Sequence, residues 1–269
     1  SRISEKEIIN YILPLIDHII NNKKNKILIS GSQGIGKTTL LKLITLILKK
    51  YYKKNILSLS LDDFYFDKKT RLELSTNIHP LLKTRGVPGT HDIKYLESII
   101  NNFDKSKYPI KLPNFDKLTD DRKKKFTYIK SKSDILILEG WCVGCPSINK
   151  KYLFNNLNYL EKKYDNNFIW RKYYNHQLKT TYFKLFKKFN SIVYLKAPSF
   201  NYVCNWRINQ EKHLKRFKKN SSLGMSNKEI RIFIQFYEKI TKWMVKKMPE
   251  KSDIVLYFNK KQKIYKLKK

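Results

Sequence analysis

The sequence predicts an α/β protein in which a five-stranded parallel sheet is covered by helices on both faces. Five short apolar runs have the length and composition of buried strands, and helical stretches separate most of them. Apolar strands that alternate with helices are typical of parallel sheets, because both faces of such strands are buried. With 269 residues and 41% hydrophobic content, we expect a single three-layer α/β/α domain over 1–269.

The elements follow one another in an order that supports this fold. A first helix over 5–20 has apolar residues at helical spacing, and Pro14 should kink or split it. The expected strands cover residues 26–30, 55–60, 134–140, 191–197 and 253–259. The other expected helices cover residues 37–50, 92–102, 176–188, 199–218 and 226–247.

Three segments fit this plan poorly. Residues 67–90 and 104–133 are rich in Pro, Gly, Asp and Lys, and long irregular stretches in a compact domain are more often functional than idle. Residues 146–174 are dominated by Asn, Lys and Tyr. We interpret this last segment as a partly helical surface insertion with little functional content.

The loop after the first strand is the clearest functional signal. Residues 31–38, GSQGIGKT, satisfy the pattern GxxxxGK[ST] between a strand and a helix. Glycines let successive backbone N–H groups point into one concavity, Lys37 brings a charge to the β- and γ-phosphates, and the Thr38 hydroxyl can ligate Mg²⁺. The residues expected to bind a nucleotide are Gly31, Ser32, Gln33, Gly34, Ile35, Gly36, Lys37, Thr38 and Thr39.

Carboxylates at two other strand ends favour phosphoryl transfer over hydrolysis. Asp62 and Asp63 follow the second strand, at the edge where parallel sheets bind ligands. Asp62 can accept a proton from an attacking hydroxyl and order water around Mg²⁺, although paired aspartates also form turns and helix caps. Glu139 ends the third strand as a single acid, where motor and helicase ATPases usually carry an Asp-Glu pair. We expect Thr38, Asp62 and Glu139 to surround the metal.

Two polar loops are the candidate acceptor pocket. In RGVPGTHD, residues 85–92, Arg85 could hold a carboxylate bidentately, while His91 and Asp92 could bond hydroxyls. For Asp92 we favour the alternative role, a cap on the helix that begins near Ile93. In LPNFDKLTDDR, residues 112–122, Lys117 and Arg122 could face substrate or phosphate, or simply solvent.

The helix after the fourth strand is a candidate lid over residues 199–222. Arg207 lies in its first turns, where kinases of the nucleoside-monophosphate type place arginines that close over the transferring group. An ordinary basic helix face is the alternative.

The high positive charge is attributed to lysine usage over the whole chain. Only eight of the 57 basic residues are arginines, so the formal charge of +35 lacks the arginine and aromatic clustering of nucleic-acid binders, and we expect no nucleic-acid partner. Without an apolar run of about 18 residues or a secretory core, we expect a cytoplasmic protein with no membrane partner, with organelle targeting and oligomeric state left open. Cys142 and Cys145 form a CxxC that could be half a zinc site or a redox pair, and we favour a simple turn.

Taken together, the motifs resemble a known kinase family. GSQGIGKTT, SLDDFY, RGVPGTHD, PNFDK followed by DR, LEGWCVG and WRINQE resemble D-glycerate 3-kinase of the plant type and its fungal relatives. The resemblance covers residues 27–258 apart from the insertion. It implies a P-loop kinase fold close to uridine kinase, phosphoribulokinase and pantothenate kinase, Mg-ATP as donor, and transfer to a primary hydroxyl of a small acid. The expected acceptor-binding residues are Asp63, Tyr65, Arg85, His91, Asp92, Lys117 and Arg122.

The sequence departs from this family in the second polar loop. The family's P-R-Y-D-K has Asn114 and Phe115 in place of Arg and Tyr, and LTDDR replaces a glycine-rich segment. Losing a cation and a hydroxyl could change which acceptor fits. Alternatives therefore remain a kinase for a nucleoside or pantothenate, and a nucleic-acid-coupled or assembly ATPase. In the proposed step Asp62 is the base, Glu139 orients Mg²⁺, and Lys37 and Arg207 offset charge.

Overall fold

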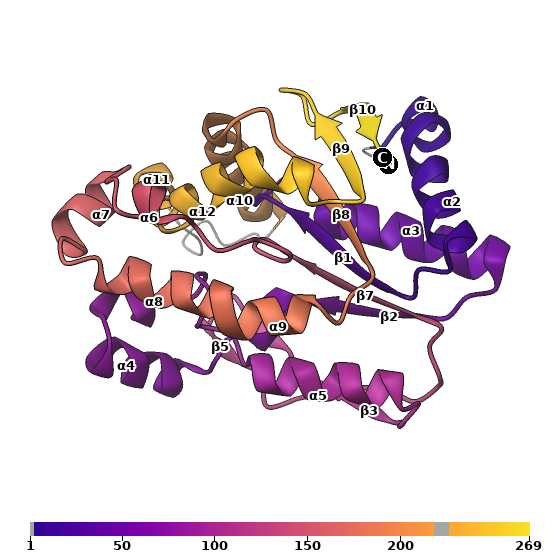
Figure 1. Cartoon of the computed structure of the whole chain (residues 1–269), viewed down its shortest axis with the longest axis horizontal. Coiled ribbons are helices and arrows are strands. Elements are labelled where there is room, and N and C mark those ends of the chain that lie inside the picture. The colour runs from indigo at the N-terminus through magenta and orange to yellow at the C-terminus, as the bar shows by residue number, and fades with distance from the viewer. Residues whose placement is uncertain (1–2, 218–225) are drawn as a thin grey trace.

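The computed structural model describes residues 3–217 and 226–269, and helices cover both faces of one central sheet (Figure 1). In the described residues the sheet has six strands in the order β10-β9-β8-β1-β7-β2. Neighbours from β9 to β2 are parallel, and β10 is antiparallel to β9. The predicted parallel sheet of five strands is confirmed, with one further edge strand. The strands are β1 (Lys26–Gly31), β2 (Ile56–Ser60), β7 (Ile135–Gly140), β8 (Ser191–Lys196), β9 (Ile254–Phe258) and β10 (Ile264–Lys268).

The edge strand β10 was not predicted, because its residues have no clear apolar pattern. Ile264 is buried, but Tyr265 is 55% exposed and lysines occupy positions 266 and 268. Short, lysine-bearing strands are typical of sheet edges, where they discourage pairing with another chain.

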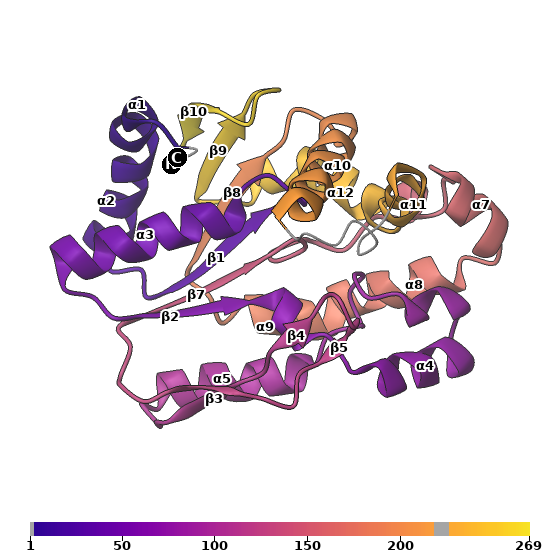
Figure 2. The same ribbon diagram turned by 180° about the vertical axis from the view of Figure 1, so that it is seen from behind.

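Each face of the sheet has its own hydrophobic core. Leu28 in β1 packs with the core under α5, α8 and α12, whereas its neighbours Ile27 and Ile29 pack with the core under α2, α3 and α10, the face seen in Figure 2. Within the described ranges, none of the helices has both the length and the apolar character to cross a membrane. The longer helices are α2 (Leu13–Asn21), α3 (Lys37–Tyr52), α5 (Ile93–Asp104), α8 (Ile169–Gln177), α10 (Phe200–Phe217) and α12 (Gln235–Lys247).

Several predicted segments divide into shorter elements. The first helix has a π-helical turn, Ile8–Ile12, directly before α2 and Pro14, which is the split expected from the proline. The segments expected to be irregular contain one helix and two small hairpins. The shorter elements are α1 (Glu5–Glu7), α4 (Lys68–Asn77), α9 (Phe183–Phe186), α11 (Asn227–Phe233), β3 (Ile110–Leu112), β4 (Phe115–Asp116), β5 (Asp121–Arg122) and β6 (Thr127–Ile129).

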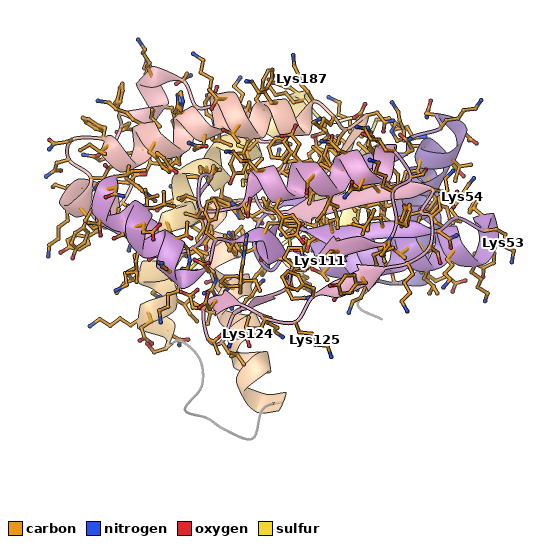
Figure 3. All side chains as sticks on the ribbon, turned by 90° about the horizontal axis from the view of Figure 1, so that it is seen from below. Lys53, Lys54, Lys111, Lys124, Lys125 and Lys187 are labelled. Atoms are coloured by element: carbon orange, nitrogen blue, oxygen red, sulfur yellow. The ribbon has the colours of Figure 1, made fainter. Side chains whose placement is uncertain are left out.

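Lysines lie on many separate elements of the surface. Figure 3 labels six of them, at places as far apart as the end of α3, the β5–β6 connection and the end of α9. The labelled residues are Lys53, Lys54, Lys111, Lys124, Lys125 and Lys187.

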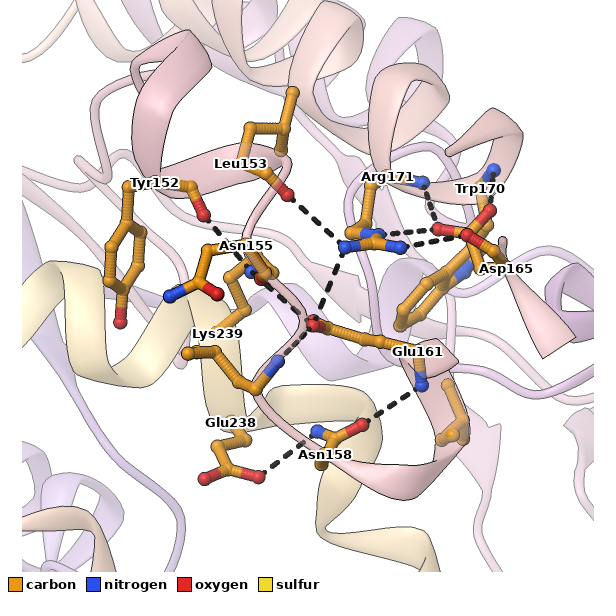
Figure 4. Close-up of polar contacts among 12 residues, drawn as sticks. Tyr152, Leu153, Asn155, Asn158, Glu161, Asp165, Trp170, Arg171, Glu238 and Lys239 are labelled. Carbon is orange, nitrogen blue, oxygen red and sulfur yellow. Dashed lines mark hydrogen bonds and ion pairs between the residues drawn. The ribbon is translucent and has the colours of Figure 1, made fainter. Parts of the chain in front are cut away.

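The interpretation of residues 146–174 as a surface insertion needs correction. The segment forms α6 (Lys150–Leu153), α7 (Tyr159–Tyr164) and part of α8, and it buries Trp170 and Tyr174 in the core under α12. Three of its charged side chains, Glu161, Asp165 and Arg171, are buried, and Arg171 Nε lies 2.7 Å from a carboxylate oxygen of Asp165 (Figure 4). Composition alone hides this, because a few buried residues are scattered among many exposed Asn and Lys residues.

Candidate active site

The phosphate loop joins β1 to α3 in a conformation that glycine permits. Gly36, directly before α3, has φ +110°, a left-handed conformation that other residues rarely adopt. A Cβ built on Gly36 would meet nothing within 4 Å, so open space lies over the loop at the N-terminal end of the helix. This end of a helix favours anions. The loop therefore fits the triphosphate of a nucleotide.

Polar atoms of the same loop are held ready for a ligand. Lys37 Nζ donates to the carbonyl of Ser32 at 3.1 Å, bridging the loop. Burial lowers the pKa of Lys37, while the carboxylates of Glu139 and Asp62 raise it. The buried side-chain oxygens of Ser32 and Gln33 have no hydrogen-bond partner among the described residues. Unpaired buried polar atoms are costly, so these two oxygens are available to a ligand or to water.

A small cavity adjoins the loop between α3 and the β9–β10 turn. Thr39, Leu40 and Phe258 contribute to its walls together with Gln262. Gln262 Nε2 donates to the carbonyl of Gly34 at 2.7 Å, which ties the turn to the phosphate loop. Of the nine residues expected to bind a nucleotide, Thr39 is thus placed beside the loop rather than inside it.

The register of the sheet brings Glu139 to the start of α3. Glu139 is opposite Ser60 in β2, and it is only 6% exposed. Its Oε1 accepts hydrogen bonds from the hydroxyls of Thr38 at 3.2 Å and Ser60 at 3.0 Å. A hydroxyl and a carboxylate together suit Mg²⁺, which usually takes one or two carboxylates and completes its shell with phosphates and water.

Asp62 lies in a 3₁₀ turn, Leu61–Phe64, directly after β2. Its Oδ2 accepts from Lys117 Nζ at 2.6 Å, and its Oδ1 accepts from the Tyr65 hydroxyl at 3.3 Å. Burial raises the pKa of Asp62, but the ammonium groups of Lys117 and Lys37 outweigh it and bring the pKa to about 2. Asp62 is therefore ionised. It does not cap the next helix, α4, because the cap of that helix is Asp67.

Asp63 has a different environment from its neighbour. Its Oδ1 accepts the backbone N–H of Phe115 at 3.4 Å, so it supports the β4–β5 hairpin. Burial raises its pKa, and the nearby Asp62 carboxylate adds to that effect. The pKa of Asp62 is therefore lowered and that of Asp63 is raised, although the two residues are adjacent in sequence.

His91 is held as a neutral ring in the loop before α5. Its ring stacks on Tyr65 with centroids 4.3 Å apart, and its Nδ1 lies 2.6 Å from the hydroxyl of Tyr182. That hydroxyl oxygen also accepts the backbone N–H of Gly89 at 3.0 Å. Burial lowers the pKa of His91 to about 3, although Asp62 opposes the shift. His91 can therefore give or accept a hydrogen bond but carries no charge near neutral pH.

Asp92 and Arg122 bind to each other instead of facing an open pocket. Asp92 caps α5 by accepting the Tyr95 N–H at 3.0 Å, which confirms the cap favoured from the sequence. Its other oxygen accepts from Arg122 at 3.1 Å, and Arg122 Nε donates to the Tyr65 carbonyl at 2.7 Å. This pair fixes the β4–β5 hairpin against the turn that carries Asp62.

Two residues that the sequence analysis did not select complete the region around Arg85. Arg85 donates to Asp120 Oδ1, and the buried Arg71 donates to Asp120 Oδ2 at 3.0 Å. Both guanidinium groups lie over the ring of Phe115, at 5.7 Å for Arg71 and 5.6 Å for Arg85. The Phe115 ring in turn contacts Tyr65 at 5.3 Å. A continuous wall therefore runs from Asp62 through Tyr65 and Phe115 to Arg85.

The predicted lid segment contains α10, Phe200–Phe217, and residues 218–222 of it lie outside the described residues. Trp206 packs against the phosphate loop, because a Cβ on Gly34 would lie 3.2 Å from its Cβ atom. Arg207 is close enough to Tyr237 to oppose the rise in the pKa of that buried phenol. Since the Tyr237 hydroxyl donates to the Arg85 carbonyl at 3.1 Å, Arg207 and the acceptor loop flank the same side chain.

Cys142 and Cys145 form the turn that the sequence analysis favoured. The Cys145 N–H donates to the Cys142 carbonyl at 3.1 Å, both side chains are buried, and burial raises the pKa of both thiols. In the described part of the chain, no three His, Cys, Asp or Glu side chains come together as a metal cluster.

Known proteins with similar sequences and folds match most of the chain. It is 33% identical over 221 residues to an uncharacterized kinase of Schizosaccharomyces pombe, covering 78% of this chain and 76% of that protein. It is 29% identical over 259 residues to a probable ATP-dependent kinase of Saccharomyces cerevisiae, covering 86% and 84%. A D-glycerate 3-kinase structure from Cryptococcus neoformans is similar in fold, with a TM-score of 0.75, 24% identity, and coverage of 91% and 89%. No family model matches the chain.

Proposed function

Because the chain belongs to the family of ATP-dependent P-loop kinases that includes its Schizosaccharomyces pombe relative, we propose that it transfers the γ-phosphate of ATP to a hydroxyl of a small hydroxy acid, D-glycerate. The carrying observation is the wall from Asp62 to Arg85, which puts a carboxylate base and a guanidinium on one surface next to Lys37. A base for a hydroxyl and a cation for a carboxylate are the two groups that such an acceptor needs.

The nucleotide half of the site consists of the phosphate loop and its neighbours. Backbone N–H groups of residues 34–38 and the ammonium of Lys37 hold the phosphates. The cavity beside Thr39 and Gln262 takes the edge of the base. Thr38, Glu139 and Asp62 would hold Mg²⁺, which would supply positive charge to offset that of the phosphates.

The acceptor half orients one hydroxyl toward Asp62. Arg85 holds the carboxylate of the acceptor, and His91 gives a hydrogen bond to a hydroxyl. Asp62 takes the proton as transfer of the phosphoryl group makes the hydroxyl acidic. Arg207 on α10 neutralises charge as the group moves.

Lys117 blocks Asp62 before the acceptor binds, and it must leave for turnover. We expect Lys117→Met to raise the pKa of Asp62, because it removes the largest effect that opposes burial and leaves the smaller effects of Lys37 and His91. Since Asp62 acts as a base, the acid-side fall in kcat/KM then occurs at a higher pH, by roughly 1–3 units. The measurement is a pH profile of kcat/KM, with Lys124→Met as the matched loss of an exposed lysine. If the acid limb does not shift, the ionisation of Asp62 does not control kcat/KM.

A coupled assay for ADP release tests the function. The acceptors are D-glycerate, L-glycerate, pantothenate, uridine and ribulose 5-phosphate, together with an acceptor-free reaction. We expect ADP only with D-glycerate, because the RGVPGTHD and PNFDK motifs resemble those of D-glycerate 3-kinase. Turnover with pantothenate or uridine but not with D-glycerate would show that the acceptor is that compound instead. Hydrolysis without any acceptor, stimulated by DNA or RNA, would replace the transferase with an ATPase.

A further inference from the structure

The cluster of Arg71, Arg85 and Asp120 has more positive charge than its ion pairs cancel. Asp120 accepts from Arg71 through Oδ2 and from Arg85 through Oδ1. Two cations share one anion, so the cluster retains one positive charge. It lies over Phe115, on the same wall as the proposed base Asp62.

Arg71 fixes Asp120 in place. Arg71 is 1% exposed, and its other N–H groups donate to the carbonyls of Phe66 at 3.2 Å, Lys83 at 2.9 Å and Asp120 itself. A buried guanidinium is costly without an anion beside it. The Asp120 backbone is also set, since its φ of +56° lies in the left-handed region. An arriving acceptor therefore meets Asp120 as a permanent part of the pocket.

Arg85 is the partner that remains open to a ligand. It is 18% exposed, whereas Arg71 is fully buried. In the described residues, the side-chain hydrogen bond of Arg85 to Asp120 uses NH1, which leaves Nε and NH2 for one planar anionic group. The Arg85 backbone carbonyl is held by Tyr237, so the side chain starts from a fixed point.

We propose that Asp120 sets the charge of the acceptor, because it cancels one of two guanidinium charges and so selects an acceptor with one negative group over an acceptor with two. The inference rests on the proposed function in one respect, namely that the acceptor's anionic group binds Arg85. Asp120 is a positioning residue that acts through Arg85. A second anionic group on the ligand would lie against the Asp120 carboxylate and be repelled by it. A single charge in direct contact with a ligand changes its affinity by about tenfold.

Two small anions of equal carbon number separate the effect of charge. Lactate has one carboxylate and tartronate has two, and both carry a 2-hydroxyl. We expect the ratio of their dissociation constants, measured by ligand-observed NMR titration of the full chain, to move about tenfold toward tartronate in Asp120→Asn. Asp104→Asn is the matched control, because it removes a surface carboxylate that pairs only with Lys26 in the described structure and should leave the ratio unchanged.

A double variant distinguishes charge from local structure. Arg71→Met with Asp120→Asn removes one cation and one anion, so the cluster keeps one positive charge, and we expect the ratio to return toward that of the unmodified protein. The double variant also keeps the test usable if Asp120→Asn alone is much less stable, because it no longer contains the buried Arg71 guanidinium without its anion. The KM for ATP should stay within about twofold throughout, a readout that general misfolding would move.

Each outcome decides one claim. A folded Asp120→Asn with an unchanged ratio, or a double variant whose ratio stays shifted, overturns the charge-setting role. If the ratio shifts as expected but D-glycerate gives no ADP, the inference stands and the choice of D-glycerate fails. If D-glycerate is phosphorylated and the ratio does not shift, the function stands and the inference fails.

Discussion

Asp62→Asn is expected to lower kcat by about 10²–10⁴-fold while the affinity for ATP stays within about twofold. The amide keeps the shape of the side chain and can still accept from Tyr65, but it cannot take a proton from the acceptor hydroxyl. ATP is held mainly by the backbone of residues 34–38 and by Lys37, which the substitution does not touch. The measurements are single-turnover transfer and calorimetric titration of ATP without Mg²⁺, because Asp62 is also a proposed metal ligand.

Asp63→Asn is the matched comparison for this prediction. Asp63 accepts a backbone N–H from Phe115, a bond that an amide oxygen can also accept, so the loss of kcat should be much smaller. The adjacent carboxylates thus test whether position or mere negative charge matters. Equal losses in both variants, or turnover that survives in Asp62→Asn, would show that the base is another group.

Much of the nucleotide half could be predicted because local sequence determines it. The glycine pattern dictates the loop, and a strand followed by a helix dictates where it lies. The convergence of Asp62 and Glu139 followed from one rule, that parallel strands end at the same edge of the sheet. The register of Ser60 with Glu139 is the structural form of that rule.

The proposed acceptor half was harder to predict because it depends on contacts between distant loops. Asp120 meets Arg85 only because the β4–β5 hairpin folds back over the turn at Asp62, and no local pattern reports that fold. Arg122 was expected to bind substrate because of its charge, yet it donates hydrogen bonds to Asp92 and to a backbone carbonyl. Sequence can name a polar loop, but the partner of each charge is a tertiary property.

The same limit applies to the buried charges of residues 146–174. Glu161 and Asp165 oppose Arg171 and Lys239, and all four are at most 2% exposed. In an Asn- and Lys-rich stretch these residues look like ordinary surface charges. Their pairing joins this segment to α12, the helix whose Tyr237 holds the acceptor loop.

Arg171→Met should therefore have the largest effect on stability, lowering the free energy of unfolding by about 3–5 kcal/mol. Arg171 donates to Asp165 through Nε at 2.7 Å, so its loss leaves the buried Asp165 carboxylate without its main cation. Glu161, 3.7 Å from Arg171, keeps Lys239 at 3.3 Å. The Met side chain fills similar volume, which limits the contribution of a cavity. Urea unfolding followed by circular dichroism gives the free energy.

Two further variants show whether the charge itself is responsible. Lys188→Met breaks a pair with Glu97 whose side chains are 32% and 42% exposed, and such exposed pairs contribute only about 0–1 kcal/mol. Arg171→Met combined with Asp165→Asn removes both partners, and it should recover part of the loss because no unpaired charge of Asp165 stays buried. A double variant as unstable as the sum of the single variants would mean that Arg171 stabilises the fold through packing and its bond to the Leu153 carbonyl rather than through the ion pair.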